Sequence, residues 1–456
     1  MKEKILFLCD ASDIEVVEQS FADDPEYELT IETSEKILQF GVRQYLEQTI
    51  ERIKNNPGMY DGIVGTHDSS AVFAAIIAQQ TGHRFAPVNA VINCQNKYLC
   101  RRIQRSVVPE HTPAYALALD YLRNPSRVSL PFFIKPVRSN ISFGTHKVGE
   151  PGELENYIAR ESIDIARFNQ YYLDALAIDP AYHNALNVAT CNSFLCEDLI
   201  HGTQVTVDGY IFEGEIDFFG ITRAVYHRET NSFFYHAFPH RFSRELTAKI
   251  KTALQKLMPA LGIDNSFFNV ELRADEDTNT FKIIEVNCRI AFQFAKTIEA
   301  VTGVDPLRML CDMAVGRRPG QRPADFQTYD FCYNFELHMF HDALILETPT
   351  QSAHAEIKMK HPEVRIRNLI HENARLSDFK HNPESFRYCV LDVPGNSHEE
   401  IMVKYQKVVS MLGYRFGAQA AETDHAHETA GAVFEPPPRR TKGGSRELSR
   451  QPLLRN

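Results

Sequence analysis

The sequence lacks any cysteine pattern. Nine cysteines are scattered singly through its 456 residues, inside apolar runs. An odd number of cysteines without paired spacing argues against a disulfide framework and against a zinc site. Such residues are typical of reduced core thiols, so we expect a cytoplasmic protein.

Long apolar runs and an excess of positive charge are also missing. No uninterrupted apolar stretch approaches the roughly 18 residues of a membrane-spanning helix. The run from Ile5 to Cys9 is closed by Asp10 and is too short for a signal peptide. Lysine and arginine total 49 against 59 acidic residues, which gives a formal net charge of −10. This balance disfavours nucleic acid or an anionic membrane as the main partner.

The chain is too long for one simple core, so we expect two to four domains. In residues 1–95 the patterns predict strands at 5–9 and 62–65 and helices at 14–21, 40–54 and 69–81. Strands that alternate with helices indicate a parallel sheet covered on both faces. The expected fold class is therefore α/β at the N-terminus.

Residues 96–315 form the next expected domain, in which strands and helices are mixed. Helices are predicted at 96–107, 154–176, 244–261 and 306–315, and strands at 132–135, 193–199, 204–212 and 216–225. A Gly/Pro/Arg linker leads to a small α+β module at 316–418, with strands at 331–339 and 387–393 and a helix at 398–412. Residues 419–456 have the composition of a disordered tail.

Two carboxylates in a predicted hairpin are the most informative feature. Glu271 and Glu285 each lie inside an apolar run of strand type, and Asn287 follows on the face of Glu285. Two acids and an amide on one face suit a hard cation such as Mg²⁺. Arg289 stays on that face and would suit phosphoryl chemistry. The alternative is a pair of surface carboxylates on an edge strand.

Two further segments carry weaker signals. Lys135 ends an apolar strand, and a polar loop runs from Arg138 to Gly144, so the segment can fold over phosphates. The alternative is a hairpin with an exposed lysine. Residues 196–209 are predicted to form a strand, a turn and a second strand. This segment can belong to a binding site, and the alternative is an ordinary hairpin with exposed acids.

The order of these segments resembles the ATP-grasp superfamily from about residue 96 to 315. In that family a lysine opens the nucleotide domain, as Lys97 does here, and a strand–Lys–Pro segment carries a phosphate loop, as at Lys135. An adenine hinge and a ribose residue follow, similar to residues 197–200 and Gln204. The metal pair and its Asn-x-Arg complete the resemblance. It implies a pre-ATP-grasp domain at 1–95, a two-subdomain ATP-grasp fold at 96–315 with a lid at about 109–195, and the C-terminal module.

The resemblance also implies a role for each position. The phosphates would be bound by Lys97, Lys135 and Ser142, and adenine by Glu197, Asp198, Leu199 and Ile200, with the Glu197 side chain near the amino group. Gln204 would bind the ribose. Glu271, Glu285 and Asn287 would hold two Mg²⁺ ions, which Mn²⁺ can replace. Arg289 would stabilise the transferred phosphoryl group, and Arg223 would be a further γ-phosphate cation.

The chain departs from the family pattern at three places. Gln204 replaces the usual ribose-binding acid, and Asn96 replaces the aspartate before the lysine. Many amino-acid ligases continue with glycines after the Asn-x-Arg, whereas this chain has aromatic residues in 292–294. We expect these aromatics to reshape the acceptor pocket.

The activity implied by the resemblance is ATP-dependent ligation of a carboxylate to an amine through an acyl phosphate, with amino acids as substrates. The layout resembles the L-amino-acid (dipeptide) ligase group, and related enzymes often form homodimers. Two alternatives stay open: a phosphotransferase or carboxylase-like ATP-grasp enzyme, and an ATP-binding regulatory protein without turnover.

Overall fold

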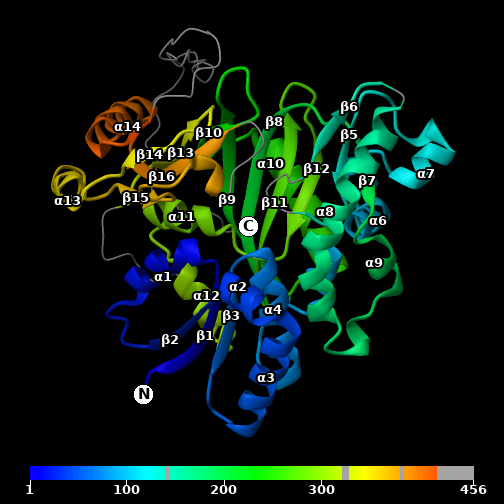
Figure 1. The fold of residues 1–456 in the computed structure, drawn as a ribbon, viewed down its shortest axis with the longest axis horizontal. Helices are drawn as coiled ribbons and strands as arrows, with labels where there is room; N and C mark the ends of the chain where they lie inside the picture. Colours follow the sequence, from blue (N-terminus) through cyan, green and yellow to red (C-terminus); the bar gives the residue numbers. More distant parts are fainter. Residues whose placement is uncertain (140–143, 151, 321–327, 380–384, 418–456) are drawn as a thin grey trace. The chain divides into compact units, whose positions relative to one another are not determined.

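A computed structural model describes residues 1–139, 144–150, 152–320, 328–379 and 385–417 (Figure 1). Ser142 and the expected tail at 419–456 lie outside the described residues. The chain divides into two compact units. The first comprises Met1–Arg223 and Ala237–Thr328, and the second comprises Ala224–His236 and Tyr329–Asn456.

The first unit begins with a parallel sheet of order β2-β1-β3. Its elements are β1 (Glu3–Cys9), α1 (Ile14–Phe21), β2 (Tyr27–Thr33), α2 (Ser34–Phe40), α3 (Val42–Asn55), β3 (Gly62–Gly65), α4 (Asp68–Thr81) and α5 (Val88–Gln95). Leu6 and Leu8 of β1 share a buried cluster with residues of α3 and α4, whereas Ile5 and Phe7 share one with residues of α1 and of α12 (Pro306–Ala314). The predicted parallel sheet, covered on both faces, is therefore confirmed.

A small antiparallel sheet of order β4-β7-β5-β6 forms the next part. Its elements are α6 (Lys97–Val107), β4 (Tyr115–Leu117), α7 (Ala118–Arg123), β5 (Phe132–Pro136), β6 (His146–Val148), α8 (Glu153–Leu176), α9 (Ala185–Thr190) and β7 (Phe194–Asp198). Its core includes Phe132, Ile134 and Phe194. Asn96 caps α6, because its side chain accepts a hydrogen bond from the Leu99 backbone N–H at 3.0 Å. This cap fixes where the helix starts and hence where Lys97 lies.

The third layer of the first unit is the antiparallel run β12-β11-β8-β9. Its elements are β8 (Thr203–Phe212), β9 (Glu215–Tyr226), α10 (Arg244–Leu261), β11 (Ser266–Asp275), β12 (Thr280–Asn287) and α11 (Ala295–Thr302). One face of these strands carries Val205 and Leu272, which share a buried cluster with Leu246 and Leu254 of α10. Residues alternate between the two faces of a strand, so Glu271 and Asn269, which flank Val270, lie on the other face.

The second unit contains strands in the order β10-β13-β16-β15 and the short pair β14-β17. Its elements are β10 (Phe233–Phe238), β13 (Phe331–Met339), β14 (Ile345–Glu347), α13 (Gln351–Lys360), β15 (Arg365–Asn368), β16 (Phe386–Gly395), α14 (His398–Leu412) and β17 (Arg415–Phe416).

Short 3-10 helices occur in both units, at Ala11–Asp13, Pro109–His111, Pro125–Arg127, Pro180–Tyr182, Phe292–Phe294 and Leu376–Asp378. Among the described residues, no helix has both the length and the apolar character needed to cross a membrane.

Candidate ATP and metal site

Glu271 and Glu285 are cross-strand neighbours on the polar face of the β12-β11-β8-β9 run. They stand directly opposite each other in the antiparallel register of β11 and β12. Burial and the neighbouring Glu285 together raise the pKa of Glu271 to about 7. Two carboxylates that oppose each other in a partly buried place need a cation to remain ionised together.

Asn287 lies in a second row of polar side chains on the same face. The register pairs Asn269 of β11 with Asn287 on one side and with Asp208 of β8 on the other. Asn287 Nδ2 donates to Asn269 Oδ1 at 3.3 Å, and Asn269 Nδ2 donates to Asp208 Oδ1 at 2.8 Å. Burial raises the pKa of Asp208 to about 6, although hydrogen bonds from Asn269 and Thr206 act in the opposite direction.

Lys97 links the start of α6 to the acidic pair. Its Nζ lies 2.9 Å from Glu285 Oε1 and donates to the backbone carbonyl of Ser139 at 2.8 Å. Ser139 follows β5, so Lys97 connects the hairpin with the start of the predicted phosphate loop. The structure thus brings together a lysine and a predicted metal ligand that lie far apart in the sequence.

Lys135 and Glu197 form a buried ion pair with Arg101. Lys135 Nζ lies 2.5 Å from Glu197 Oε2, and Arg101 Nε donates to Glu197 Oε1 at 2.5 Å. Burial would raise the pKa of Glu197, but the two cations outweigh it and lower the pKa to about 2. Burial lowers the pKa of Lys135, and Glu197 opposes that effect. The Glu197 carboxylate is therefore held by cations, and its expected place near the adenine amino group stays a prediction.

Arg101 is a site residue that our sequence reasoning missed. Its guanidinium also donates to the Ile284 carbonyl at 2.6 Å, at a point where the β11–β12 register shifts and Ile284 has no residue opposite. Arg101 follows Lys97 by one helical turn, so the two lie on the same side of α6. That spacing is the signal that the sequence offered.

The remaining predicted nucleotide residues lie where β7 ends and β8 begins. The backbone N–H of Asp198 donates to the Ala114 carbonyl at 3.1 Å, and Leu199 and Ile200 follow with half-buried side chains. Gln204 Oε1 accepts a hydrogen bond from Arg273 at 3.2 Å, its cross-strand neighbour. Their contacts with adenine and ribose stay predictions.

Arg289 is positioned by the N-terminal sheet. Its Nε donates to Asp68 Oδ1 at 2.6 Å, and Asp68 is the first residue of α4, just beyond the carboxyl end of β3. The turn from β3 into α4 requires Gly65, because a Cβ at that position would clash with the Ser70 carbonyl. Burial would raise the pKa of Asp68, but Arg289 outweighs it and the pKa is lowered. Open α/β sheets bind ligands at this edge.

A recess lies between Asp68, the partner of Arg289, and Glu285 of the acidic pair. It is lined by Asp68, Gln95, Arg138, Ser139, Phe168, Tyr171, Glu285 and Asn287. Arg138 is buried there, and its guanidinium lies 4.0 Å from the centre of the Tyr172 ring. Asp68 was assigned no role from the sequence, since it reaches the site only through folding, and Arg138 was included only as the start of the polar loop expected to fold over phosphates.

The strand register places Arg223 away from the acidic pair. Arg223 pairs with Val205, whose side chain lies in the apolar cluster with α10. Thr206, one residue on, pairs with Glu271 and so shares the face of the acids. Arg223 is exposed on the opposite face. This placement argues against its predicted role as a γ-phosphate cation.

The aromatic residues after Arg289 belong to the interior. Phe292 and Phe294 are 5% and 3% exposed, and Phe292 shares a buried cluster with residues of β1 and α12. The Phe292 ring also faces His67, with ring centres 5.8 Å apart. Core packing therefore accounts for both aromatics, and the expectation that they reshape an acceptor pocket gains no support from their burial.

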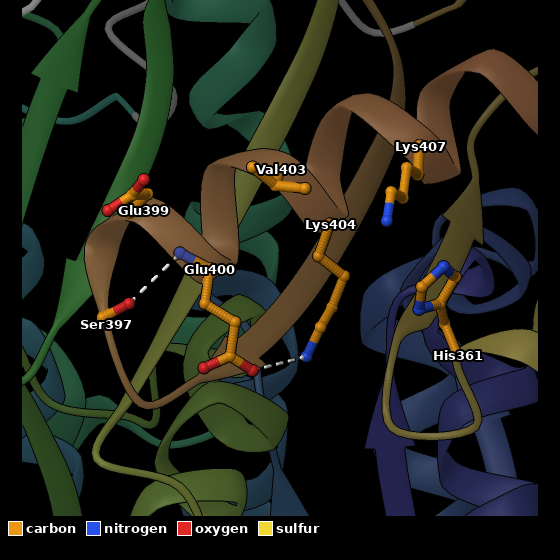
Figure 2. Close-up of a pocket in the computed structure, with 7 residues that line it drawn as sticks. All are labelled: His361, Ser397, Glu399, Glu400, Val403, Lys404 and Lys407. Atoms are coloured by element: carbon orange, nitrogen blue, oxygen red, sulfur yellow. Dashed lines mark hydrogen bonds and ion pairs between the residues drawn. The ribbon is translucent and has the colours of Figure 1, made fainter.

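A larger hollow of about 410 Å³ lies in the second unit (Figure 2). It is lined by His361, Ser397, Glu399, Glu400, Val403, Lys404 and Lys407. Lys404 Nζ lies 2.7 Å from Glu363 Oε1 and donates to the Pro394 carbonyl at 2.7 Å. None of the residues predicted for chemistry lines this hollow, so the candidate site is the one around the acidic pair.

The donor set around the acidic pair fits Mg²⁺ bound together with phosphates. Among the described residues, no three His, Cys, Asp or Glu side chains are grouped so that they hold a metal unaided. Mg²⁺ is usually bound by one or two carboxylates, with substrate phosphates and water completing its ligands. Glu271, Glu285 and Asn287 supply two carboxylates and an amide on one face, which suits that mode.

Comparison with known families agrees with this geometry. Residues 128–297 match a family model described as an ATP-grasp domain. No protein with a curated description matches the chain in sequence. The resemblance read from the motifs is thus confirmed, because the chain carries an ATP-grasp domain. Proteins of this class use ATP and Mg²⁺ in general, and one of the similar structures was solved with MgADP.

Solved structures show the same fold over most of the chain. An L-amino acid ligase from Bacillus licheniformis is 16% identical with a TM-score of 0.67, and the match covers 91% of this chain and 99% of that one. A phosphoribosylglycinamide synthetase from Anaerococcus prevotii is 14% identical with a TM-score of 0.62, covering 91% and 100%. The biotin carboxylase domain of a Hydrogenobacter thermophilus 2-oxoglutarate carboxylase, solved with MgADP and bicarbonate, is 13% identical with a TM-score of 0.63, covering 91% of each chain. The chain therefore has the fold of ATP-grasp enzymes.

Proposed function

We propose that this protein is an ATP-dependent ligase that activates a carboxylate as an acyl phosphate and joins it to an amine. The observation that carries the proposal is the opposition of Glu271 and Glu285, with Lys97 at 2.9 Å from Glu285 and Arg289 held beside the same recess by Asp68. Likeness to an L-amino acid ligase supports amino acids as substrates.

The nucleotide half of the site follows from the lysines and the hinge. Lys97 and Lys135 would neutralise the α- and β-phosphates, and Ser142 would cover the outer phosphates. The peptide groups of 198–200 would face adenine, and Gln204 would bind the ribose. Residues of about 109–195 would close over ATP as a lid and exclude water, which would otherwise hydrolyse the acyl phosphate.

The metal half of the site serves the transferred phosphoryl group. Two Mg²⁺ ions, or Mn²⁺ in their place, would offset the charge that builds on the phosphates. Glu271, Glu285 and Asn287 would hold them. Arg289 would donate bidentately to the phosphoryl oxygens and to the substrate carboxylate, while Asp68 keeps its guanidinium in place.

The reaction would proceed in two balanced steps. A carboxylate oxygen of the acid attacks the γ-phosphorus, the bond from that phosphorus to the β-bridging oxygen breaks, and ADP leaves. The amine nitrogen then attacks the acyl carbon, a C–N bond forms, and the C–O bond to phosphate breaks. The amine loses a proton and inorganic phosphate is released. Activation is needed because a free carboxylate is a poor electrophile, whereas the acyl phosphate carries phosphate as a good leaving group.

The domain layout and the cellular setting belong to the same proposal. We assign the pre-ATP-grasp domain to 1–95, the ATP-grasp domain to 96–315 and the C-terminal module to 316–418. The enzyme would act in the cytoplasm on small molecules and would form a homodimer.

Trapping of the acyl phosphate tests the proposal. The protein is incubated with ATP, Mg²⁺, pooled amino acids and hydroxylamine, and hydroxamates, ADP and phosphate are measured. A hydroxamate that requires both ATP and one particular acid supports the ligase. If ATP binds but no mixture of acids and amines yields ADP or phosphate, the ligase proposal is contradicted.

A second candidate is a carboxylase-like or phosphotransferase enzyme, favoured by the likeness to the biotin carboxylase domain solved with bicarbonate. Such an enzyme would form ADP together with a stable phosphorylated or carboxylated product. A regulatory ATP-binding protein would bind ATP without turnover. Product analysis in the same assay distinguishes the three outcomes.

A further inference from the structure

Three side chains on neighbouring strands form one continuous hydrogen-bonded row. Asn287 of β12, Asn269 of β11 and Asp208 of β8 stand opposite one another in register. Asn287 Nδ2 donates to Asn269 Oδ1 at 3.3 Å, and Asn269 Nδ2 donates to Asp208 Oδ1 at 2.8 Å. All three are buried, with exposed fractions of 9%, 4% and 3%. The row ends at Asn287, which lines the recess together with Glu285.

The chemistry of the end group sets the direction of this row. An ionised carboxylate only accepts hydrogen bonds, whereas a side-chain amide has a donating end and an accepting end. Asp208 therefore turns the Nδ2 of Asn269 toward itself, and the Oδ1 of Asn269 must point to Asn287. That oxygen draws the Nδ2 of Asn287. The remaining polar atom of Asn287, its Oδ1, is the one left for a cation.

Asp208 is an expensive residue to keep at this position. Its described hydrogen-bond partners are the neutral groups of Asn269 and Thr206. Among the described residues, no Lys or Arg forms an ion pair with it. Arg289 attracts it without forming an ion pair, and this attraction lowers the pKa of Asp208 less than burial raises it. A buried carboxylate without an ion-pair partner destabilises a fold, so packing alone would favour a neutral side chain of similar size. A need for a group that only accepts hydrogen bonds explains the carboxylate.

We propose that Asp208 is a positioning residue that, through Asn269, turns the amide oxygen of Asn287 toward the metal. This inference rests on the proposed function, because it assumes that Asn287 is a metal ligand. Partners behind metal ligands typically affect metal affinity by about 10- to 100-fold. Neither Asp208 nor Asn269 is among the residues proposed to bind ATP, so nucleotide affinity in the absence of metal should not depend on the row.

An exchange of the two residues tests the direction of the row. Asp208→Asn can turn its amide either way and no longer fixes Asn269, so Mn²⁺ binding in the presence of ADP should weaken about tenfold or more. Asn269→Asp places two carboxylates side by side and should also weaken it. The double variant Asp208→Asn/Asn269→Asp restores an acceptor beside Asn287, and its Mn²⁺ affinity should return to within about threefold of wild type.

Binding of Mn²⁺ is followed by electron paramagnetic resonance at fixed ADP, with metal-free ADP affinity and thermal unfolding measured in parallel. Thr206→Val is the matched control, since it removes the other hydrogen bond to Asp208 and leaves the row intact, so Mn²⁺ affinity should not change. Wild-type affinity in Asp208→Asn, or a double variant as weak as the single ones, overturns the inference.

The design separates failure of the inference from failure of the proposed function. Wild-type protein that binds no Mn²⁺ with ADP contradicts the metal-dependent function itself. If Asp208→Asn does not fold, the double variant decides: recovered affinity supports the orienting role, and weak affinity in a folded double variant overturns it.

Discussion

Glu271 and Glu285 face each other across β11 and β12, and Lys97 contacts only one of them, at 2.9 Å from Glu285. Glu271 is the member whose pKa is raised to about 7, by burial and by the neighbouring Glu285. The two carboxylates therefore repel each other when no metal ion is bound, and the pair is suited to bind one. This conflict between stability and binding gives the first prediction.

Glu271→Gln should stabilise the protein without metal and abolish its response to Mg²⁺. Removal of one of two opposed charges should raise the free energy of unfolding by about 1 kcal/mol. The stabilisation that MgADP gives to wild type should disappear, and turnover should fall by roughly 10² or more. Thermal unfolding with and without MgADP measures both effects. Asp277→Asn, an exposed carboxylate in the same hairpin, is the control. A Glu271→Gln protein that is still stabilised by MgADP would contradict the metal assignment.

Arg101→Leu should destabilise the fold strongly. Arg101 is buried and shares Glu197 with Lys135, so its removal leaves a buried carboxylate with one cation fewer. The expected cost is about 3 kcal/mol or more. Urea unfolding measures this loss of stability. The control is Arg102→Leu, an exposed neighbour on the same helix, whose free energy of unfolding should stay within about 0.5 kcal/mol of wild type. Equal stability of the two variants would show that the ion pair is not formed as described.

Arg289→Lys should lower kcat more than it raises the KM for ATP. Lysine keeps the charge but loses the fork that binds Asp68 and phosphoryl oxygens together. We expect kcat to fall by roughly 10² and KM to change by less than about fivefold. Asp68→Asn frees the guanidinium and should cost about tenfold in kcat. Steady-state ADP release checks both, and an unchanged kcat in Arg289→Lys would remove this residue from the chemistry.

Arg223→Ala should leave turnover nearly unchanged. Its register with Val205 places it on the face opposite Glu271. Exposed substitutions of this kind change the free energy of unfolding by about 0.5 kcal/mol or less, so the variant should fold normally and its steady-state ADP release should match wild type. A loss of 10² would instead restore Arg223 to the phosphate site.

The second unit should lose stability in mild acid because of His236. Burial lowers the pKa of His236 to about 4, although Glu336 opposes that effect. The unfolded histidine titrates near 6.5, so the stabilisation is complete above that pH and is lost as the pH falls toward 4. Between pH 7.5 and pH 5 the loss should be about 2 kcal/mol. Hydrogen exchange of β13 and β16 peptides at both pH values measures it.

His236→Gln is the matched control for this pH dependence. It removes the titrating group, so the extra opening at pH 5 should disappear. Glu336 contributes only at lower pH: burial would raise its pKa, but Arg387 outweighs burial and lowers it to about 2. Its stabilisation is present above about pH 4.5 and is lost below that. Equal exchange in wild type and His236→Gln at pH 5 would rule out His236 as the source.

Several elements could be read from local patterns alone. The helix at 244–261 is α10 with the same bounds, and it stops at Gly262, whose φ of 80° favours glycine. The strand at 331–339 and the helix at 398–412 also have the predicted bounds. Strand β2 was missed, because its half-exposed residues show no apolar run. Strand β10 was not predicted, because its sequence Phe-Phe-Tyr-His-Ala-Phe shows no alternation of apolar and polar residues.

The sequence by itself determined the acidic hairpin, the two lysines and their order, because strand alternation and chain order are local properties. Only the tertiary structure decided which groups meet. Asp68, Arg101 and Arg138 reach the site from other elements, and register alone puts Arg223 on one face and Asp208 on the other. Contacts between residues far apart in sequence depend on strand pairing and helix packing. Residue spacing does not encode these.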